Sequence, residues 1–176
     1  IMNIFVEAFF FFLPAGLSNM APVLINKVPV INRWNTPLDF GKSYKGERIF
    51  GQNKTWRGLV SGVVFAGLIA SMEAAWYYHA SPDYFRHLVI RGMLMGFGAL
   101  AGDAIESFFK RQSGIAAGSS WFPFDQTDYI VGGLVMSLFV SAWNTKLFLV
   151  VIFEYFGLHL FTSYLAFKMK LKDKPI

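Results

Sequence analysis

The feature that most constrains this chain is a series of five long apolar runs separated by more polar segments. The runs cover residues 4–28, 59–78, 88–109, 129–143 and 147–167. A membrane-spanning helix needs about 20 mostly apolar residues, and all but the run at 129–143 reach or approach this length. Hydrophobic residues make up 55% of the 176 residues and charged residues only 15%, which is too apolar for an ordinary soluble domain. The sequence therefore predicts an all-α polytopic membrane protein with five transmembrane helices.

The first apolar run contains residues that disturb a regular helix. Pro14, Gly16, Asn19 and Pro22 all fall inside it. Proline removes a backbone donor, and in a membrane the freed groups must face protein or water. We therefore expect a kinked or broken first helix. The run also lacks the basic start and cleavage site of a signal peptide, so we expect it to remain in the mature protein.

The distribution of Lys and Arg predicts how the chain is oriented. With five helices, a long loop at about 29–58, a second loop at about 110–128 and the C-terminus share one side, and this side carries 13 of the 16 Lys and Arg residues. Cytoplasmic segments are enriched in these residues. We expect the N-terminus outside, the C-terminus in the cytoplasm, and one transmembrane catalytic domain over residues 1–176. A tight turn at 143–146 should make the last two helices antiparallel neighbours.

Acidic residues beside the apolar runs indicate a polar site. A carboxylate near the middle of a lipid-facing helix costs about 2.5–3.5 kcal/mol on insertion scales, so such residues usually face a polar cavity. Asp103, Asp125 and Asp128 are the candidates, and the chain has no cysteine. Carboxylate oxygens without thiolates suit Mg²⁺, which is commonly completed by water and substrate phosphates. Asp128 has a simpler interpretation as the N-cap of the helix that follows it.

Basic residues accompany the acidic ones on one predicted helix. Asp103, Glu106, Ser107 and Lys110 are spaced three or four apart and share a face, and Arg111 lies one turn beyond Ser107. At a rise of 1.5 Å per residue, Asp103 lies about 10 Å deeper than Lys110, near the lipid headgroups. Glu106 and Lys110 could also form an intrahelical salt bridge with no functional role.

The loop at about 29–58 is far longer than most connections, and such loops are generally functional or disordered. We expect most of its polar residues, including Asp39 and Arg48, to form a solvated surface. Three residues lie just before a helix expected to begin near Gly58, and a helix N-terminus attracts anions, so phosphate contact is favoured for them. They are Lys54, Thr55 and Arg57.

These spaced motifs resemble the membrane CTP-dependent phosphatidate cytidylyltransferase group. Ser107, Lys110 and Arg111 match a Ser, Lys and Arg that follow an acidic helix in that group, and Asp125 and Asp128 match its pair of Asp three apart. The group also has a Lys-Thr-Trp-variable-Gly segment, which is matched here by Lys54, Thr55, Trp56, Arg57 and Gly58. Its Gly-Asp pair is matched by Gly102 and Asp103.

The short length and the Asp-Gln-Thr-Asp segment look most like the archaeal branch of this group, the CDP-archaeol synthases. The N-terminal pattern of that branch is matched by Pro14, Ala15, Asn19 and Pro22. Residues 118–123 depart from the bacterial pattern, which has a His-Gly-Gly run before the double Asp, so the roles of those residues cannot be carried over.

The resemblance implies an Mg²⁺-dependent transfer of the cytidylyl group from CTP to a membrane lipid phosphate. In the archaeal branch the acceptor is unsaturated 2,3-di-O-geranylgeranylglyceryl phosphate, and the products are a CDP-archaeol-type lipid and pyrophosphate. The implied catalytic and metal-binding residues are Asp103, Asp125 and Asp128. The implied substrate-binding residues are Asn19, Lys54, Thr55, Arg57, Ser107, Lys110 and Arg111. The expected partners are CTP, the lipid phosphate and the bilayer, with no nucleic acid; the oligomeric state is not predicted.

Two other functions are compatible with the residues alone. Intramembrane carboxylates also occur in cation transporters and channel subunits, although a conduction path needs polar residues through the full depth of the membrane. A small structural membrane subunit is the other alternative. Glu73 and Glu154 are intramembrane carboxylates without an assigned role. The histidines are expected to be interfacial residues; they are His79, His87 and His159.

Overall fold

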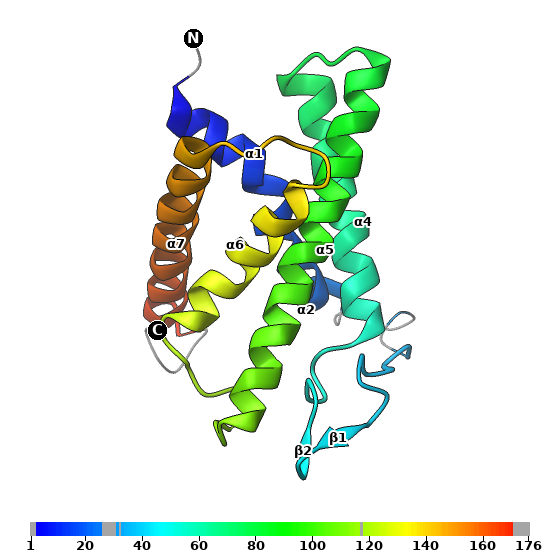
Figure 1. Cartoon of the computed structure of the whole chain (residues 1–176), viewed down its shortest axis with the longest axis vertical. Helices are drawn as coiled ribbons and strands as arrows, with labels where there is room; N and C mark the ends of the chain where they lie inside the picture. Colours follow the sequence, from blue (N-terminus) through cyan, green and yellow to red (C-terminus); the bar gives the residue numbers. More distant parts are fainter. Residues whose placement is uncertain (1–2, 26–30, 32, 117, 171–176) are drawn as a thin grey trace.

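The structure is a computed structural model that describes residues 3–25, 31, 33–116 and 118–170. This part of the chain is mostly helical, and α6 runs obliquely between α7 and the long central helix α5 (Figure 1). The elements are α1 (Ile4–Ser18), α2 (Ala21–Ile25), β1 (Ser43–Tyr44), β2 (Glu47–Arg48), α4 (Trp56–Met72), the π-helical turn η1 (Glu73–Tyr77), α5 (Pro82–Gln112), α6 (Phe124–Ser137) and α7 (Thr145–Lys168). The predicted all-α class is confirmed.

Four stretches of the described residues are long and apolar enough to cross a membrane. They are Ile4–Ile25, Trp56–Tyr77, Pro82–Gln112 and Thr145–Lys168. At 14 residues, or about 21 Å, α6 is shorter than a hydrocarbon core of about 30 Å. The chain is therefore a polytopic membrane protein with four or five spans, depending on whether the short α6 is counted.

The expected limits of the last two helices were wrong. A helix was expected at 129–143, but α6 runs over Phe124–Ser137, with Pro123 at its N-cap position. α6 ends earlier than expected because the N–H groups that follow Ser137 donate to carbonyls three residues back instead of four. The Leu138 N–H, for example, donates to the Val135 carbonyl at 3.2 Å. The tight turn expected at 143–146 is also misplaced, since α7 already begins at Thr145. The helix starts there because the Asn144 side chain caps it, accepting a hydrogen bond from the Leu147 N–H at 3.1 Å.

The first apolar run is broken, as its sequence predicts. α1 ends at Ser18 and α2 begins at Ala21, so Asn19 and Met20 form the break. Pro14 is accommodated inside α1, whereas Pro22 lies in the first turn of α2, where its missing N–H has no helical partner to lose. The predicted end of this segment at residue 28 lies outside the described residues.

The long loop is organised around a buried carboxylate, which contradicts the expectation of a solvated surface for Asp39 and Arg48. Asp39 is only 5% exposed. It accepts hydrogen bonds from Arg48 at 2.5 Å and from the N–H groups of Gly41, Phe50 and Gly51 at 2.9–3.2 Å. Burial raises the pKa of Asp39, but the opposite effect of Arg48 and these backbone N–H groups is larger, so the pKa falls to about 2. The ionised carboxylate therefore holds together the segment that carries the β1–β2 hairpin.

The loop ends earlier than expected because Thr55 caps the next helix. Its side-chain oxygen accepts a hydrogen bond from the Gly58 N–H at 3.2 Å, and α4 begins at Trp56 rather than near Gly58. The Leu38 N–H donates to the Lys54 carbonyl at 2.8 Å, and the Trp56 N–H donates to the Thr36 carbonyl at 3.0 Å. These bonds fix the backbone direction at Lys54 relative to the rest of the loop.

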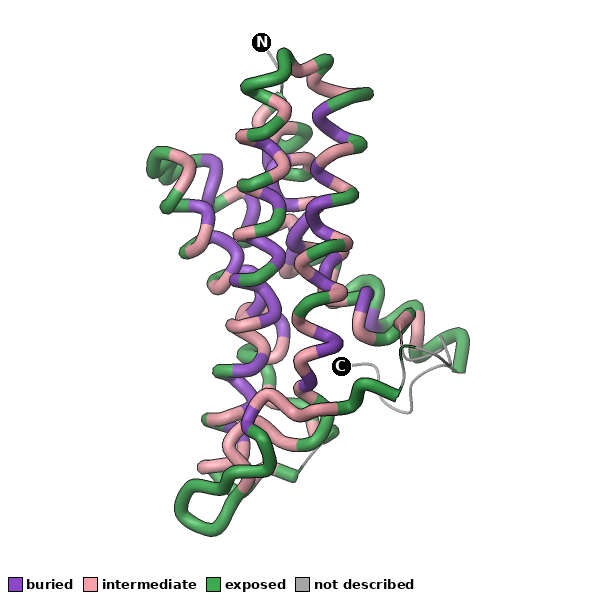
Figure 2. The backbone as a smooth tube through the Cα atoms, turned by 90° about the vertical axis from the view of Figure 1, so that its right-hand side faces the viewer, coloured by how far each residue is buried: buried purple, intermediate pink, exposed green. Residues whose placement is uncertain are grey.

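The core lies where α1, α5, α6 and α7 meet, and Figure 2 shows buried residues along the middle of the helices and exposed ones near both ends. Phe12, Met95, Ile130 and Val151 contribute one fully buried side chain from each of these helices. The Tyr155 hydroxyl donates to the Phe9 carbonyl at 2.7 Å. Because backbone groups are otherwise satisfied within each helix, this bond adds a specific tie between α7 and α1.

Candidate active site

A polar pocket of about 300 Å³ lies on one side of the bundle, between α2, the start of α4, the middle of α5 and the start of α6. It gathers six of the sequence-predicted site residues from four separate segments. They are Asn19, Lys54, Thr55, Asp103, Asp125 and Asp128. The break after α1 places Asn19 there, and the loop before α4 supplies Lys54 and Thr55. The long-range packing of these segments therefore brings these six predicted residues together in one pocket.

Lys54 and Asp103 form an ion pair across this pocket. No Lys or Arg lies three or four residues after Asp103 on its own helix, and the structure supplies a cation from a segment 49 residues earlier. Both side chains keep part of their surface accessible, 23% for Lys54 and 33% for Asp103. The pair is therefore open to exchange of partners when an anionic molecule enters.

Lys110 joins two carboxylates at the end of the pocket. Its ammonium lies 3.4 Å from Glu106, as the intrahelical spacing predicts, and 2.5 Å from Asp125 at the start of α6. The N–H of Trp121 also donates to Asp125, at 2.6 Å. Lys110 is only 8% exposed, so this arrangement is an internal ion-pair network. The network ties the first turn of α6 to α5.

Asp128 lies in the second turn of α6 and is not an N-cap, because Pro123 occupies that position. Its carboxylate accepts a hydrogen bond from the Tyr129 N–H at 2.6 Å. The backbone of Asp128 is in close contact with α5, since a Cβ added to Gly102 would lie 2.3 Å from the Asp128 carbonyl oxygen. This contact brings Asp128 beside the helix that carries Asp103.

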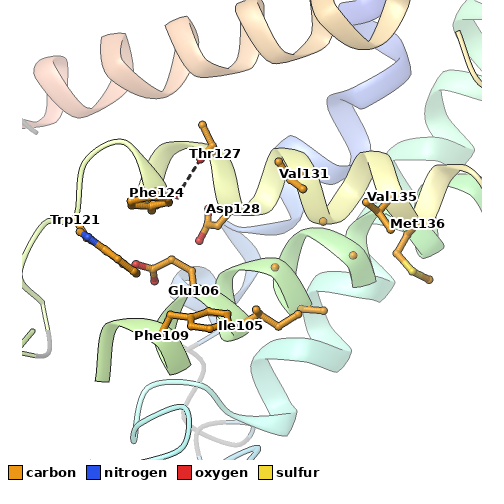
Figure 3. A pocket seen from close by; sticks show the side chains of 14 residues that line it. Ile105, Glu106, Phe109, Trp121, Phe124, Thr127, Asp128, Val131, Val135 and Met136 are labelled. Carbon is orange, nitrogen blue, oxygen red and sulfur yellow. Dashed lines mark hydrogen bonds between the residues drawn. The ribbon is translucent and has the colours of Figure 1, made fainter. Parts of the chain in front are cut away.

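Asp128 also borders a second, apolar groove of about 530 Å³ between α5 and α6. Figure 3 shows Asp128 and Glu106 among the apolar side chains of this groove, with Phe109 on α5 and Val131 on α6. Asp128 is thus shared by a polar pocket and an apolar groove. This geometry can receive a molecule with a charged head and an apolar body.

Four predicted substrate-binding residues do not line the polar pocket. Lys110 reaches it only through Asp125, and Ser107 is buried on α5. Arg57 is also buried and lines a separate apolar groove between α2 and α4. Arg111 lies near the C-terminal end of α5 and lines none of these three cavities.

Sequence reasoning missed two polar residues of the pocket wall, Asn53 and His159. Asn53 precedes Lys54, so its position follows from that of its neighbour. His159 was expected to be an interfacial residue, and it reaches the pocket because α7 packs beside α6, with the His159 and Tyr129 rings 5.8 Å apart. No short-range pattern could have shown this, since His159 is separated by 31 residues from Asp128.

The donor chemistry of the pocket fits Mg²⁺. Three carboxylates line it, and Mg²⁺ commonly binds through one or two carboxylates, several waters and substrate phosphates. Among the described residues, no group of three or more His, Asp or Glu side chains is arranged so that it could by itself hold a metal ion. Asp103 and Asp125 are instead paired with Lys54 and Lys110. The residues therefore suit an ion whose coordination is completed by water and substrate.

Fold and site together define a membrane-embedded protein with a charged pocket that meets an apolar groove. The family model described as CarS-like, CDP-archaeol synthase, matches residues 1–176. The chain belongs to the CDP-archaeol synthase family, and it is an enzyme of the lipid cytidylyltransferase class. The predicted resemblance to the archaeal branch is thereby confirmed.

Individual relatives agree with this assignment along almost the whole chain. A CDP-archaeol synthase of Thermococcus onnurineus is 32% identical, with 96% of this chain and 95% of that protein covered. One from Pyrococcus furiosus is 33% identical, with 99% of both covered. A solved structure described as an intramembrane enzyme for archaeal membrane lipid biosynthesis matches with a TM-score of 0.76 and 28% identity, covering 92% of this chain and 94% of that one.

Proposed function

We propose that this enzyme transfers the cytidylyl group from CTP to the phosphate of an archaeal ether lipid, 2,3-di-O-geranylgeranylglyceryl phosphate. The products are a CDP-archaeol-type lipid and pyrophosphate. The observation that carries the proposal is Asp128, which borders both the charged pocket and the apolar groove. A nucleoside triphosphate needs the charged pocket. A lipid acceptor needs the charged pocket for its phosphate and the apolar groove for its chain. Family membership supports the same reaction.

In the proposed reaction, an oxygen of the lipid phosphate attacks the α-phosphorus of CTP. The bond between the α-phosphorus and the oxygen bridging to the β-phosphate breaks, and pyrophosphate leaves with the electron pair. A phosphate monoester is already anionic near neutral pH, so no strong base is needed. Catalysis then consists of alignment and charge neutralisation, as in other phosphoryl transfers.

The residues of the pocket have distinct proposed roles in this reaction. Lys54 is the accessible cation that turns from Asp103 to a substrate phosphate, and Asn19 and Thr55 provide polar contacts beside it. Asp103, Asp125 and Asp128 would hold Mg²⁺, which when bound offsets the negative charge of the phosphates.

The predicted binding residues outside the pocket are assigned supporting roles. Lys110 positions Asp125 through their ion pair. Three residues do not line the pocket, and we propose that they contribute to binding through the elements that surround it. They are Arg57, Ser107 and Arg111.

The proposed site faces the cytoplasm at the depth of the headgroups. The start of α6 and the β1–β2 hairpin lie toward the same end of the molecule as the C-terminal end of α5 (Figure 1). CTP would reach the pocket from the cytosol while the lipid phosphate stays in the headgroup layer. Transport of a cation through the protein has no specific observation in its favour, and the family is one of enzymes.

Replacement of the pocket carboxylates tests the proposal. Asp125→Asn and Asp128→Asn should each abolish CTP- and Mg²⁺-dependent formation of CDP-lipid by the purified protein, because the ligands of the divalent ion are weakened. The measurement is the yield of labelled product from CTP and a panel of ester- and ether-linked lipid phosphates. Asp83→Asn is the matched control, since Asp83 is exposed and pairs with Arg86 within the first turn of α5.

The control should keep full activity, and it and the Asp128→Asn variant should insert and elute as the wild type does. Asp125→Asn should still insert but be less stable, because it also loses the ion pair with Lys110. Undiminished turnover in a purified Asp125→Asn or Asp128→Asn protein would contradict the assignment. Product identity in the wild type decides between ester and ether lipid acceptors.

A further inference from the structure

The groove between α5 and α6 differs in position from a second apolar groove on the molecule. The second groove, of about 440 Å³, lies between α2 and α4 and is lined by Leu24, Val64 and Leu68. It shares no lining residue with the polar pocket, whereas the α5–α6 groove shares Asp128 with it. Among the described residues, only the α5–α6 groove of these two borders the charged pocket, through Asp128.

Close backbone contact gives the α5–α6 groove its shape. A Cβ added to Gly98 would lie 2.2 Å from the Gly132 carbonyl oxygen, and one added to Gly132 would lie 2.1 Å from that of Gly98. The helices therefore touch along glycines, and the larger side chains stand beside the contact as walls. Ile105, Phe109 and Val135 are 52–54% exposed on these walls, so the groove opens sideways rather than being enclosed.

The groove is long enough to reach from the headgroup layer into one leaflet. From Gly98 to Phe109 it follows 12 residues of α5, or about 16 Å at the helical rise. Half of a hydrocarbon core of about 30 Å is about 15 Å. The two carboxylates of the groove lie within this stretch rather than at its end, because Asp128 contacts Gly102, and the buried Glu106 lies one turn further along α5, 3.4 Å from the Lys110 ammonium. A lipid whose head lies in the polar pocket beside Asp128 would place its chain along the apolar walls that run from there to Val135 and Met136.

We propose that the α5–α6 groove holds a hydrocarbon chain of the lipid acceptor while its phosphate lies in the polar pocket beside Asp128. This inference rests on the proposed function and adds the path of the chain to it. The acceptor enters sideways from the bilayer between α5 and α6, not between α2 and α4. The walls of this groove then determine which chain shapes can align the phosphate with CTP.

Two matched tryptophan variants test the path. Val135 and Val64 are both 52% exposed valines, one in each groove. Val135→Trp should raise the KM for the long-chain lipid phosphate about tenfold or more, because a displaced chain misaligns the phosphate. It should leave the KM for CTP, and turnover of a very short-chain ether lipid phosphate, unchanged. Val64→Trp should match the wild type in all three measurements.

A wild-type experiment avoids any dependence on the folding of a variant. A di-isoprenoid glycerol phosphate that carries a diazirine in one chain is irradiated with the protein in nanodiscs, and the attachment sites are mapped by mass spectrometry. Attachment should concentrate at residues 98–101 and 131–136, and unlabelled lipid phosphate should compete it away.

Several results would overturn the inference. In the labelling experiment, they are attachment between α2 and α4, attachment spread evenly over the lipid-facing helices, or cross-links between two copies of the chain in this groove. In the variants, the contradicting result is an equal KM for the long-chain lipid phosphate in Val135→Trp and Val64→Trp. Each is distinct from failure of the proposed function, which would appear as a wild-type protein that forms no CDP-lipid from CTP and any lipid phosphate.

Discussion

Two lysines in and around the polar pocket have different surroundings. Lys110 is 8% exposed and contacts both Glu106 and Asp125, whereas Lys54 pairs with Asp103 where both side chains are partly accessible. Removing one partner of a buried ion pair leaves an uncompensated charge, which is strongly destabilising. Exposed pairs contribute little to stability. We therefore assign Lys110 mainly to the architecture of the site and Lys54 to its chemistry.

Methionine substitutions should separate these two roles. Lys110→Met should lower the free energy of unfolding by about 3 kcal/mol or more, because the buried Glu106 and the partly buried Asp125 lose their cation. Lys54→Met should change stability by less than about 1 kcal/mol while strongly reducing turnover. Thermal unfolding of the purified proteins and CDP-lipid formation are the measurements. Equal losses of stability in the two variants would show that the roles are not divided in this way.

Residue-level prediction from the sequence succeeded where the partners are close along the chain. The Glu106–Lys110 pair follows from helical spacing and is present at 3.4 Å. The pairing of Asp103 with Lys54, and of Asp125 with Lys110, could not be derived in that way, because residues 49 and 15 positions apart meet only through tertiary packing. Asp39 shows the same limit, since its burial depends on how the loop folds back on itself.

At the scale of elements, the contact between α5 and α6 controls the position of Asp128. The two helices approach closely at Gly98, Gly102 and Gly132, where a side chain would meet backbone atoms of the partner helix. Small residues allow such close approach in membranes, where packing between helices replaces the hydrophobic driving force. Because the Asp128 carbonyl oxygen is part of this contact, any separation of the helices moves the carboxylate.

Gly98→Ala should therefore impair both stability and activity. The new Cβ would lie 2.2 Å from the Gly132 carbonyl oxygen, and overpacking of this kind typically costs about 1–3 kcal/mol. Gly157→Ala in α7 is the control, since no atom lies within 4 Å of its added Cβ. It should be neutral or slightly stabilising, because alanine favours helix over glycine.

The thermal unfolding midpoint of each glycine variant, measured in the same detergent, is the first readout, and CDP-lipid formation is the second. If the Gly98→Ala variant were as stable and active as the Gly157→Ala variant, the helices could separate at this crossing without cost.

Helix ends were the least predictable property of the elements. The apolar runs located the spans, but α6 starts five residues before the expected position and ends six before it. The apolar pattern does not report the N-cap position of Pro123 or the tightened turns after Ser137, which depend on local backbone hydrogen bonds.

At the scale of the whole molecule, the orientation in the membrane follows from where charge collects. α5 has 31 residues and is about 46 Å long, so it extends beyond a hydrocarbon core of about 30 Å. Its C-terminal end carries Lys110 and Arg111. The β1–β2 hairpin lies toward the same end (Figure 1), and its residues include Lys45 and Arg48. The positive-inside rule predicts that this end is cytoplasmic.

Single cysteines can test the orientation without background, because the chain contains no cysteine. Asp83→Cys and Lys45→Cys place exposed thiols near the start of α5 and in the hairpin. In intact cells, a membrane-impermeant maleimide should label the Asp83→Cys variant at once and the Lys45→Cys variant only after permeabilisation. The reverse order would place the proposed site on the outer face and contradict access by cytosolic CTP.

The sequence by itself determined the helical membrane class, the approximate spans, an interruption in the first apolar run and the family, because these depend on local composition and on motifs of fixed spacing. Tertiary structure alone decided that Lys54 meets Asp103, that His159 reaches the pocket, and that Asp128 lies where a charged pocket joins an apolar groove. The physical reason is that apolar periodicity specifies a helix, whereas its neighbours depend on which small residues allow two backbones to touch.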